Sequence, residues 1–335
     1  MPVVNSSICG IGICDRLGFQ VALAFILLGG SVKTPANEVS IVVRLDTKVT
    51  AMAFSPDGRS LAAGGKDGGL ISWDLHALKQ AFSAKAHAAQ VSSLVYSKDG
   101  NVLASASWDK SVQLRNPQTG EMKGPRLKHK ERVLDIALSP NGKVLASGGV
   151  GNEIRLWDTG TGKQLGVLEG HDASVFVVRF STDGKSLASG SWDNTIVVWD
   201  TCTHAKKQRL RGHSDAVVSL AFSPDGRFLS SVSYDQSMKR WNLASATLEC
   251  SQTPADSFVF PAVFSPDSRV VASPTFGGEI VLRAVPSGAR LMSFPARRHG
   301  DEPLLCFSAN GELLAAATER QIEIRRVDLR GMPGK

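Results

Sequence analysis

The sequence predicts an all-β fold built from similar units that repeat along most of the chain. A Trp or Arg recurs every 42 residues, at Trp73, Arg115, Trp157, Trp199, Trp241, Arg283 and Arg325. A Ser-x-Asp-Gly-like tetrad keeps the same step with one single-residue slip at the last, and begins at Ser55, Ser97, Ser139, Ser181, Ser223, Ser265 and Ser308. Seven units of 42 residues account for nearly all of the 335 residues, so the repeat decides the architecture.

Each unit reads as four short strands. In the fourth unit we expect strands at residues 175–180, 187–191, 196–199 and 208–210, where β-branched and aliphatic residues gather. The tetrads supply the hairpin turn between the first two strands, because Pro at the second position presets φ, Asp or Asn caps locally, and Gly accepts a positive φ. No stretch outside residues 17–30 indicates an amphipathic helix.

The two ends of the repeat region complement each other. Residues 39–45 predict a strand that precedes the first complete unit and has no unit of its own. The seventh unit stops after three strands. We expect the N-terminal strand to complete the last unit, which removes a free sheet edge.

Residues 1–38 lie outside the repeat. Residues 17–30 form an apolar run broken only by Gln20, which is short for a membrane span of about 20 residues. Its length fits the apolar centre of a signal peptide. However, the preceding segment is long, and the negative charge of Asp15 cancels the positive charge of Arg16 that a signal peptide would carry there. A signal or membrane anchor, a cap packed on the repeats and a mis-assigned start all stay open. Localisation is therefore open between the cytoplasm, which we favour, and export or anchoring through residues 17–30.

Composition indicates a globular protein without an obvious reaction centre. The chain is 42% hydrophobic and 21% charged, with a formal net charge of +7. Its five cysteines are scattered and lack zinc-like spacing, so no disulfide framework is indicated. There is no G-x-S-x-G elbow, P-loop, His-Glu-x-x-His or kinase signature. We expect a non-enzymatic protein with no cofactor and no metal.

Polar residues recur with the same period. His171, Ser191, Asp193 and Trp199 resemble the His-Ser-Asp-Trp hydrogen-bond tetrad of the WD-repeat family, and the next unit repeats it with His213, Ser233, Asp235 and Trp241. An earlier unit keeps His87, Ser107 and Asp109, with Arg115 in place of Trp. In that family Asp accepts from His, His contacts Ser, and Ser accepts from the indole N–H. We interpret these residues as structural, because equivalent histidines of a radial repeat lie too far apart to share a metal.

The resemblance covers residues 39–328 and implies a monomeric seven-bladed β-propeller of four-stranded blades, closed by the N-terminal strand. Residues 1–38 then form a separate segment and residues 329–335 a short tail. The unit ending at Trp157 keeps His129 but has Gly151 in place of the carboxylate, and the sixth and seventh units keep none of the four. We expect those two units to be the least stable.

The residue before the turn Asp is a candidate contact position. Its occupants are Lys66, Trp108, Val150, Trp192, Tyr234 and Phe276. The resemblance places this position on one face of the propeller, near the channel mouth. Large aromatic residues there are typical anchors of protein interfaces, but they also pack on neighbouring blades, and the two readings stay open. Phe258 and Phe260 would widen this patch.

Two basic clusters are candidate binding surfaces for an acidic ligand, as an alternative to the aromatic contact position. They comprise Lys123, Arg126, Lys128, Lys130 and Arg132, and Lys206, Lys207, Arg209 and Arg211. We favour solvated outer strands whose charges discourage edge pairing over a phosphate-binding surface. The family resemblance implies a protein-interaction scaffold that uses Trp108, Trp192, Tyr234 and Phe276, with Arg132 as a further candidate contact. Binding of nucleic acid or another acidic ligand is the alternative, and the identity of the protein partner is open.

Overall fold

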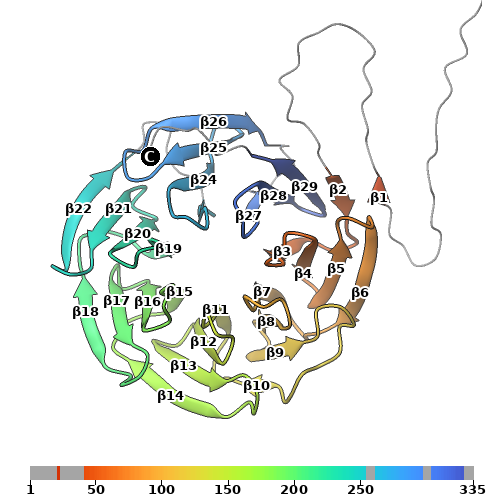
Figure 1. Ribbon diagram of the computed structural model, residues 1–335, viewed down its shortest axis with the longest axis horizontal. Helices are drawn as coiled ribbons and strands as arrows, with labels where there is room; N and C mark the ends of the chain where they lie inside the picture. The colour runs from red at the N-terminus through yellow and green to blue at the C-terminus, as the bar shows by residue number, and fades with distance from the viewer. Residues whose placement is uncertain (1–20, 23–40, 254–260, 297–302, 328–335) are drawn as a thin grey trace, which may run out of the picture.

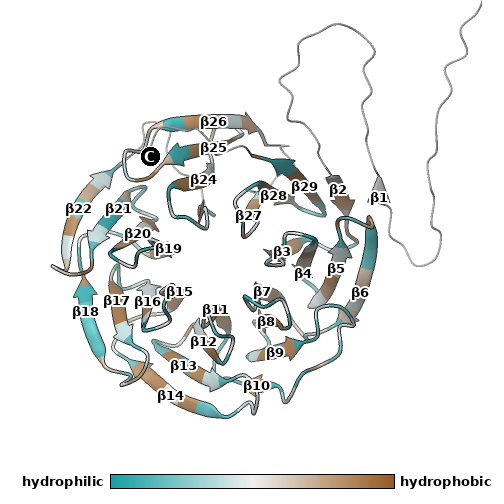
Figure 2. Ribbon diagram, viewed as in Figure 1, coloured by the Kyte–Doolittle hydropathy of each residue, from teal (hydrophilic) through white to brown (hydrophobic). Residues whose placement is uncertain are grey.

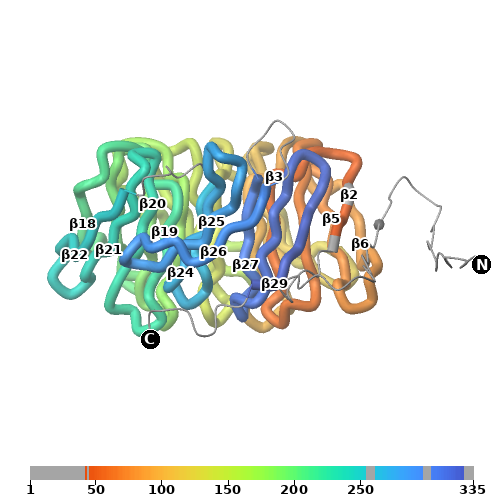
Figure 3. Tube along the Cα trace, turned by 90° about the horizontal axis from the view of Figure 1, so that it is seen from above, coloured from red at the N-terminus to blue at the C-terminus, as the bar shows by residue number. Residues whose placement is uncertain are grey.

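The computed structural model describes residues 21–22, 41–253, 261–296 and 303–327. Within them, antiparallel sheets stand side by side around a central channel as seven blades, and no helix occurs (Figure 1). Viewed from the side, the molecule is a disc whose two faces are made by the loops between strands (Figure 3). The expected all-β seven-bladed propeller is confirmed.

The inner strands of the first four blades begin 42 residues apart. Blade 1 contains β3 (Val49–Phe54), β4 (Ser60–Gly65), β5 (Gly69–Asp74) and β6 (Lys79–Lys85). Blade 2 contains β7 (Val91–Tyr96), β8 (Leu103–Ser107), β9 (Ser111–Arg115) and β10 (Leu127–Lys128). Blade 3 contains β11 (Val133–Leu138), β12 (Val144–Gly149), β13 (Glu153–Asp158) and β14 (Gln164–Glu169). Blade 4 contains β15 (Val175–Phe180), β16 (Ser186–Ser191), β17 (Ile196–Asp200) and β18 (Lys206–Leu210).

The remaining blades complete the ring. Blade 5 contains β19 (Val217–Phe222), β20 (Phe228–Ser233), β21 (Met238–Asn242) and β22 (Thr247–Gln252). Blade 6 contains β23 (Val263–Phe264), β24 (Val270–Pro274), β25 (Glu279–Ala284) and β26 (Arg290–Pro295). Blade 7 contains β27 (Leu304–Phe307), β28 (Leu313–Thr318), β29 (Gln321–Arg326), β2 (Ile41–Arg44) and β1 (Val21–Ala22).

Strand β2 closes the ring as the sequence predicts. It pairs antiparallel with β29, with Val43 opposite Ile322, so the last blade combines both ends of the repeat region. Strand β1 then pairs with the outer edge of β2, which makes this sheet five-stranded and differs from the four-stranded blade we expected. An unpaired outer edge offers backbone groups to any nearby extended segment. The rest of residues 17–30 lies outside the described residues.

Apolar residues fill the space between adjacent blades. One repeat position on the second strand is at most 1% exposed in all seven blades, at Leu61, Leu103, Leu145, Leu187, Leu229, Val271 and Leu314. Burying each such side chain contributes about 1.5–3 kcal/mol. The outermost strand of blade 4, β18, is hydrophilic from Lys206 to Arg209, and only its last residue, Leu210, is buried in the core (Figure 2). The described residues contain no helix that is long and apolar enough to span a membrane.

The innermost strands carry a β-bulge near their first residue in blades 1 to 5. A bulge bends the strand and re-aims the side chain of the extra residue. The bulged Thr50 and Ser92 each donate a hydroxyl hydrogen bond to the next blade, to the carbonyl oxygens of Val91 and Val133 at 2.7 Å. In blade 4 the bulged residue is Phe176.

Candidate functional site

Blade 4 contains a buried hydrogen-bond network centred on a histidine. The Asp193 carboxylate accepts from Nδ1 of His171 at 2.8 Å. Nε2 of the same ring then accepts from the Ser189 hydroxyl at 2.7 Å, and the Trp199 indole N–H donates to Ser189 Oγ at 2.8 Å. His213, Asp235, Ser231 and Trp241 repeat this geometry in blade 5.

The tetrad serine was assigned wrongly from the sequence: it is Ser189, not Ser191, in blade 4. Ser191 stands two residues further along β16, where it donates to the Ala173 carbonyl and accepts from the Asp193 amide. Two residues along a strand return a side chain to the same face, so the sequence pattern fits both serines. The same correction replaces Ser233 by Ser231 and, in blade 2, Ser107 by Ser105.

The networks are closed to solvent. The side chains of His171 and Asp193 are 0% and 6% exposed. Burial alone would raise the pKa of Asp193, but hydrogen bonds from His171, Thr195 and the Asp172 amide outweigh it and hold that pKa well below its usual range. Burial lowers the pKa of His213 despite the opposing charge of Asp235. Groups so enclosed have no access to a ligand, and they staple the loop before each blade to its inner strands.

Two blades contain incomplete networks. In blade 3, Trp157 donates to Ser147 at 2.9 Å and His129 lies 3.3 Å from the same hydroxyl, with Gly151 where a carboxylate would stand. Burial lowers the pKa of His129 to about 4, and the charge of Arg155 adds to the shift. In blade 2, His87 contacts Asp109 at 3.0 Å and Ser105 at 2.9 Å.

In that second blade Arg115 occupies the place of the Trp. It is buried and donates to the Gly120 carbonyl and to Gln113 Oε1, both at 2.6 Å. The guanidinium therefore binds within its own blade and does not reach His87 through the serine. Among the described residues no cluster of three or more His, Cys, Asp or Glu could hold a metal.

The candidate contact position is exposed in successive blades. Nine large hydrophobic side chains of the described residues are exposed, and five of them occupy this one position in five consecutive blades. We call these five the apolar arc; their exposures are Trp108 38%, Val150 45%, Trp192 57%, Tyr234 40% and Phe276 74%. Phe258 and Phe260, which we expected to widen it, lie outside the described residues.

Exposed members of the apolar arc also contact neighbouring side chains. Phe176 stacks on Trp192 with ring centroids 5.6 Å apart, and meets Tyr234 edge-on at 6.3 Å. The guanidinium of Arg132 lies 4.9 Å from the ring centroid of Trp108. Phe176 is the residue that sequence reasoning missed. Its signal is the bulge position of the inner strand, which is occupied by Thr50, Ser92, Leu134, Phe176 and Val218.

The two basic clusters differ in their surroundings. In the cluster on β18, Lys207 pairs with Asp200 at 3.0 Å and Arg209 with Asp172 at 2.8 Å, while Lys206 lies over the Trp199 ring. In the cluster of blade 2, Arg126 pairs with Asp109 at 3.3 Å and Lys123 donates to the Asn101 carbonyl. Three further cations are exposed: Lys128 at the end of β10, and Lys130 and Arg132 on the loop that leads from it into blade 3.

The described residues line a central channel and a small crevice. The central channel has a volume of about 750 Å³ and is lined by the inner strands, with Lys98, Asp135 and Arg179 as its charged residues. Asp135 accepts from the Ser93 hydroxyl at 2.8 Å, the Val178 amide at 3.0 Å and Arg179 at 2.5 Å, and so ties blades 2, 3 and 4 together.

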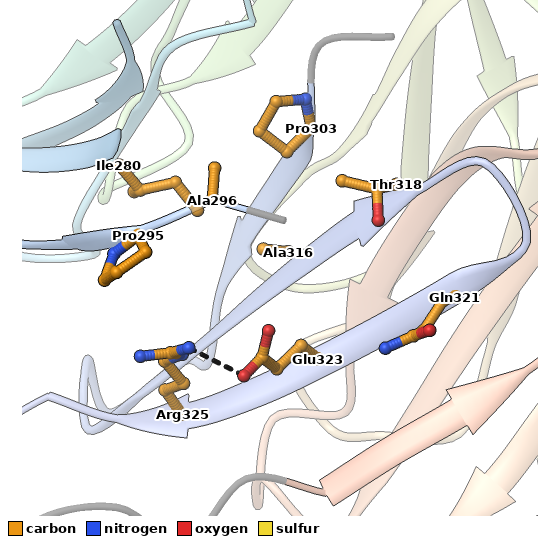
Figure 4. A pocket seen from close by; sticks show the side chains of 9 residues that line it. All are labelled: Ile280, Pro295, Ala296, Pro303, Ala316, Thr318, Gln321, Glu323 and Arg325. Carbon is orange, nitrogen blue, oxygen red and sulfur yellow. Dashed lines mark hydrogen bonds and ion pairs between the residues drawn. The ribbon is translucent and has the colours of Figure 1, made fainter. Parts of the chain in front are cut away.

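The second cavity is a crevice between blades 6 and 7, beside Pro295 and Pro303 (Figure 4). Its volume of about 10 Å³ is room for a single water molecule. Arg325, which pairs with Glu323 at 2.7 Å, borders it. The crevice is too small for a cofactor.

Comparison with known proteins agrees with this geometry. The family model described as "IFT122 first beta-propeller" matches residues 132–324, more than half of the chain. The model described as "WD domain, G-beta repeat" matches residues 41–74 and 78–116. A search of curated proteins found no match. Propellers of these families are generally non-enzymatic and typically mediate protein–protein interactions. Seven blades, stapling tetrads and both matches lead to one conclusion: the chain belongs to the WD-repeat β-propeller family.

Proposed function

We propose that this protein is a non-enzymatic scaffold that binds a protein partner through the apolar arc. The observation that carries the proposal is the coincidence of exposure and repeat position in five successive blades. Singly scattered exposed apolar residues are normal on a soluble protein, whereas contiguous ones mark an interaction surface. Trp and Tyr are also the residue types most enriched among the few that dominate binding energy.

Two rings of the apolar arc are held by contacts with another side chain, which favours binding. Phe176 contacts both Trp192 and Tyr234, so these rings are held in place before a partner arrives. Immobilising a flexible side chain at an interface costs about 0.5–1.5 kcal/mol, and an anchored ring avoids much of that cost. The contacts thus make packing and binding compatible roles of the same residues.

The alternative, binding of nucleic acid through the basic strands, is less well supported. The cations Lys207 and Arg209 on β18 are already paired with carboxylates of the protein. A phosphate would have to displace those partners. Association through phosphates would also weaken by orders of magnitude between low and physiological salt, whereas an interface centred on aromatic residues would weaken much less.

The test compares partner capture from native lysate by the wild type and by the variant Trp108→Ala, Trp192→Ala, Tyr234→Ala. A matched control removes three exposed apolar side chains outside the arc, with Met122→Ala, Leu165→Ala and Leu248→Ala. We expect a protein partner that the wild type and the control capture and the arc variant loses. Folding of each variant is checked by its unfolding midpoint. Equal capture by the arc variant would refute the proposal.

A further inference from the structure

The first two members of the apolar arc flank a group of four exposed cations. These are Lys110, Lys128, Lys130 and Arg132, which we call the basic loop cluster. Backbone bonds place the cluster between Trp108 and Val150: the His129 amide donates to the Lys110 carbonyl at 2.8 Å, and the Val150 amide donates to the Arg132 carbonyl at 3.0 Å. Arg132 also covers part of the Trp108 ring. Cations and apolar side chains therefore form one surface.

The cluster is not required by the repeat. The positions of Lys128, Lys130 and Arg132 are occupied one unit earlier by Ala86, Ala88 and Gln90 and one unit later by Gly170, Asp172 and Ser174. A loop that folds equally well with small, neutral or acidic residues does not need three cations for its structure. The positive charge of this loop is therefore not a requirement of the fold.

Lys110 supports the same conclusion. It has a φ of 67°, in the left-handed region, and the equivalent residues of three other blades are Gly68, Asn194 and Gln236. Gly and Asn adopt this conformation most easily, so a Lys there gives up some backbone stability. Its side chain gains little in return within the protein, because its contact with Glu131 is 3.7 Å long and both groups are about half exposed.

The charge of the cluster is largely unneutralised. Among the described residues, no carboxylate lies within ion-pair distance of Lys128, Lys130 or Arg132, and Glu131 is the one acidic residue of the loop. In β18, by contrast, Lys207 and Arg209 are paired with carboxylates of the protein. Positive potential is thus concentrated at one end of the apolar arc, where it would speed the arrival of a negatively charged partner.

Nucleic acid fits this surface less well than protein. Single-stranded nucleic acids bind by stacking bases on open aromatic faces, but Arg132 covers one face of Trp108 and Phe176 one face of Trp192. Val150, which lies between those two rings in the arc, offers no stacking surface. Apolar side chains combined with carboxylates would satisfy both the arc and the cluster.

We propose that the partner presents an acidic segment with apolar residues, whose carboxylates meet Lys110, Lys128, Lys130 and Arg132 while its apolar side chains contact Trp108 and Val150. This inference rests on the proposed function and adds the chemistry of the partner to it. It also orients the partner, since its acidic part lies over the junction of blades 2 and 3.

The test selects random 12-residue displayed peptides on the full-length protein and measures the charge of those that bind. Binding of the selected peptides is then compared between the wild type, the variant Lys128→Glu, Lys130→Glu and the control Lys143→Glu, Lys185→Glu. Both variants change the net charge equally, and the control lies after the tetrad turns on the opposite face. Arg132 is kept so that Trp108 retains its neighbour.

We expect acidic, apolar peptides whose association is about tenfold or more slower with the loop variant, and nearly unchanged with the control. Neutral or basic peptides that are lost from the Trp108→Ala, Trp192→Ala, Tyr234→Ala variant would overturn this inference and leave the scaffold proposal standing. Peptides that bind that variant as well as the wild type, or no selected peptide at all, would overturn both. Preferential binding of a thymidine oligonucleotide that is lost with the loop variant would replace the acidic segment by nucleic acid.

Discussion

The substitution Ser189→Ala is the sharpest test of how the blades are held together. It would leave two buried groups without a partner, the Trp199 indole N–H and Nε2 of His171, which now lie 2.8 Å and 2.7 Å from Ser189 Oγ. An unsatisfied buried polar group costs about 1–3 kcal/mol. Because the two groups share one hydroxyl, we expect a combined loss in the free energy of unfolding of about 2–4 kcal/mol.

The matched control is Ser191→Ala, two residues along the same strand. That hydroxyl is also buried, but it donates to the Ala173 carbonyl and accepts from the Asp193 amide, and both partners belong to part-buried residues. We expect a loss of about 1 kcal/mol, the net value of an ordinary hydrogen bond. The pair Ser231→Ala and Ser233→Ala repeats the comparison in blade 5, where Ser231 bonds His213 and Trp241.

Urea unfolding followed by tryptophan fluorescence measures both effects. If the slope with denaturant is unchanged, the shift in midpoint reports the change in stability. A loss for Ser191→Ala equal to or larger than that for Ser189→Ala, in both blades, would refute the assignment of the tetrad serine and the reasoning from buried partners.

Three further predictions concern stability. Burial lowers the pKa of His129 to about 4, so the unfolded chain binds a proton near pH 6.5 and the folded chain only near pH 4. Stability should fall as the pH drops from 6.5 to 4, and His129→Gln should reduce that fall; an unchanged pH dependence of the unfolding midpoint would contradict this. Asp135→Ala removes the carboxylate that joins blades 2, 3 and 4 and should lower the free energy of unfolding in urea by about 2–3 kcal/mol; this value allows for the half-exposed Arg179, which weakens its ion pair. An unchanged free energy of unfolding would contradict the role of Asp135 in joining the blades. Amides of residues 261–296 and 303–327, in blades without the tetrad, should exchange hydrogen faster than those of residues 168–242, and equal protection would contradict the expectation that these two blades are the least stable.

Periodicity was sufficient for the fold because each unit repeats the same local instructions. The turn tetrads mark the hairpins, and the apolar residues between them mark the strands, as in β15 (Val175–Phe180). The unmatched strand at the start and the vacancy at the end also predicted the pairing of β2 with β29. Counting along the chain was enough for these conclusions.

The contacts between side chains, in contrast, could not be predicted by counting along the chain. Ser189 and Ser191 lie on one face of one strand, and only the three-dimensional register shows which of them the His171 ring reaches. Phe176 stands at the bulge position of its strand, and only the structure shows that its ring packs against Trp192 and Tyr234. The candidate contact position was visible as a spacing, but its exposure was not.

The sequence alone established the repeat, the number of blades and the way the ring closes, because these depend on local turn chemistry and strand periodicity. The tertiary structure alone decided that the apolar arc is exposed, that Arg132 lies over Trp108, and that two cations of β18 pair with Asp172 and Asp200. Exposure and charge pairing arise between residues that are distant along the chain, so no local pattern records them.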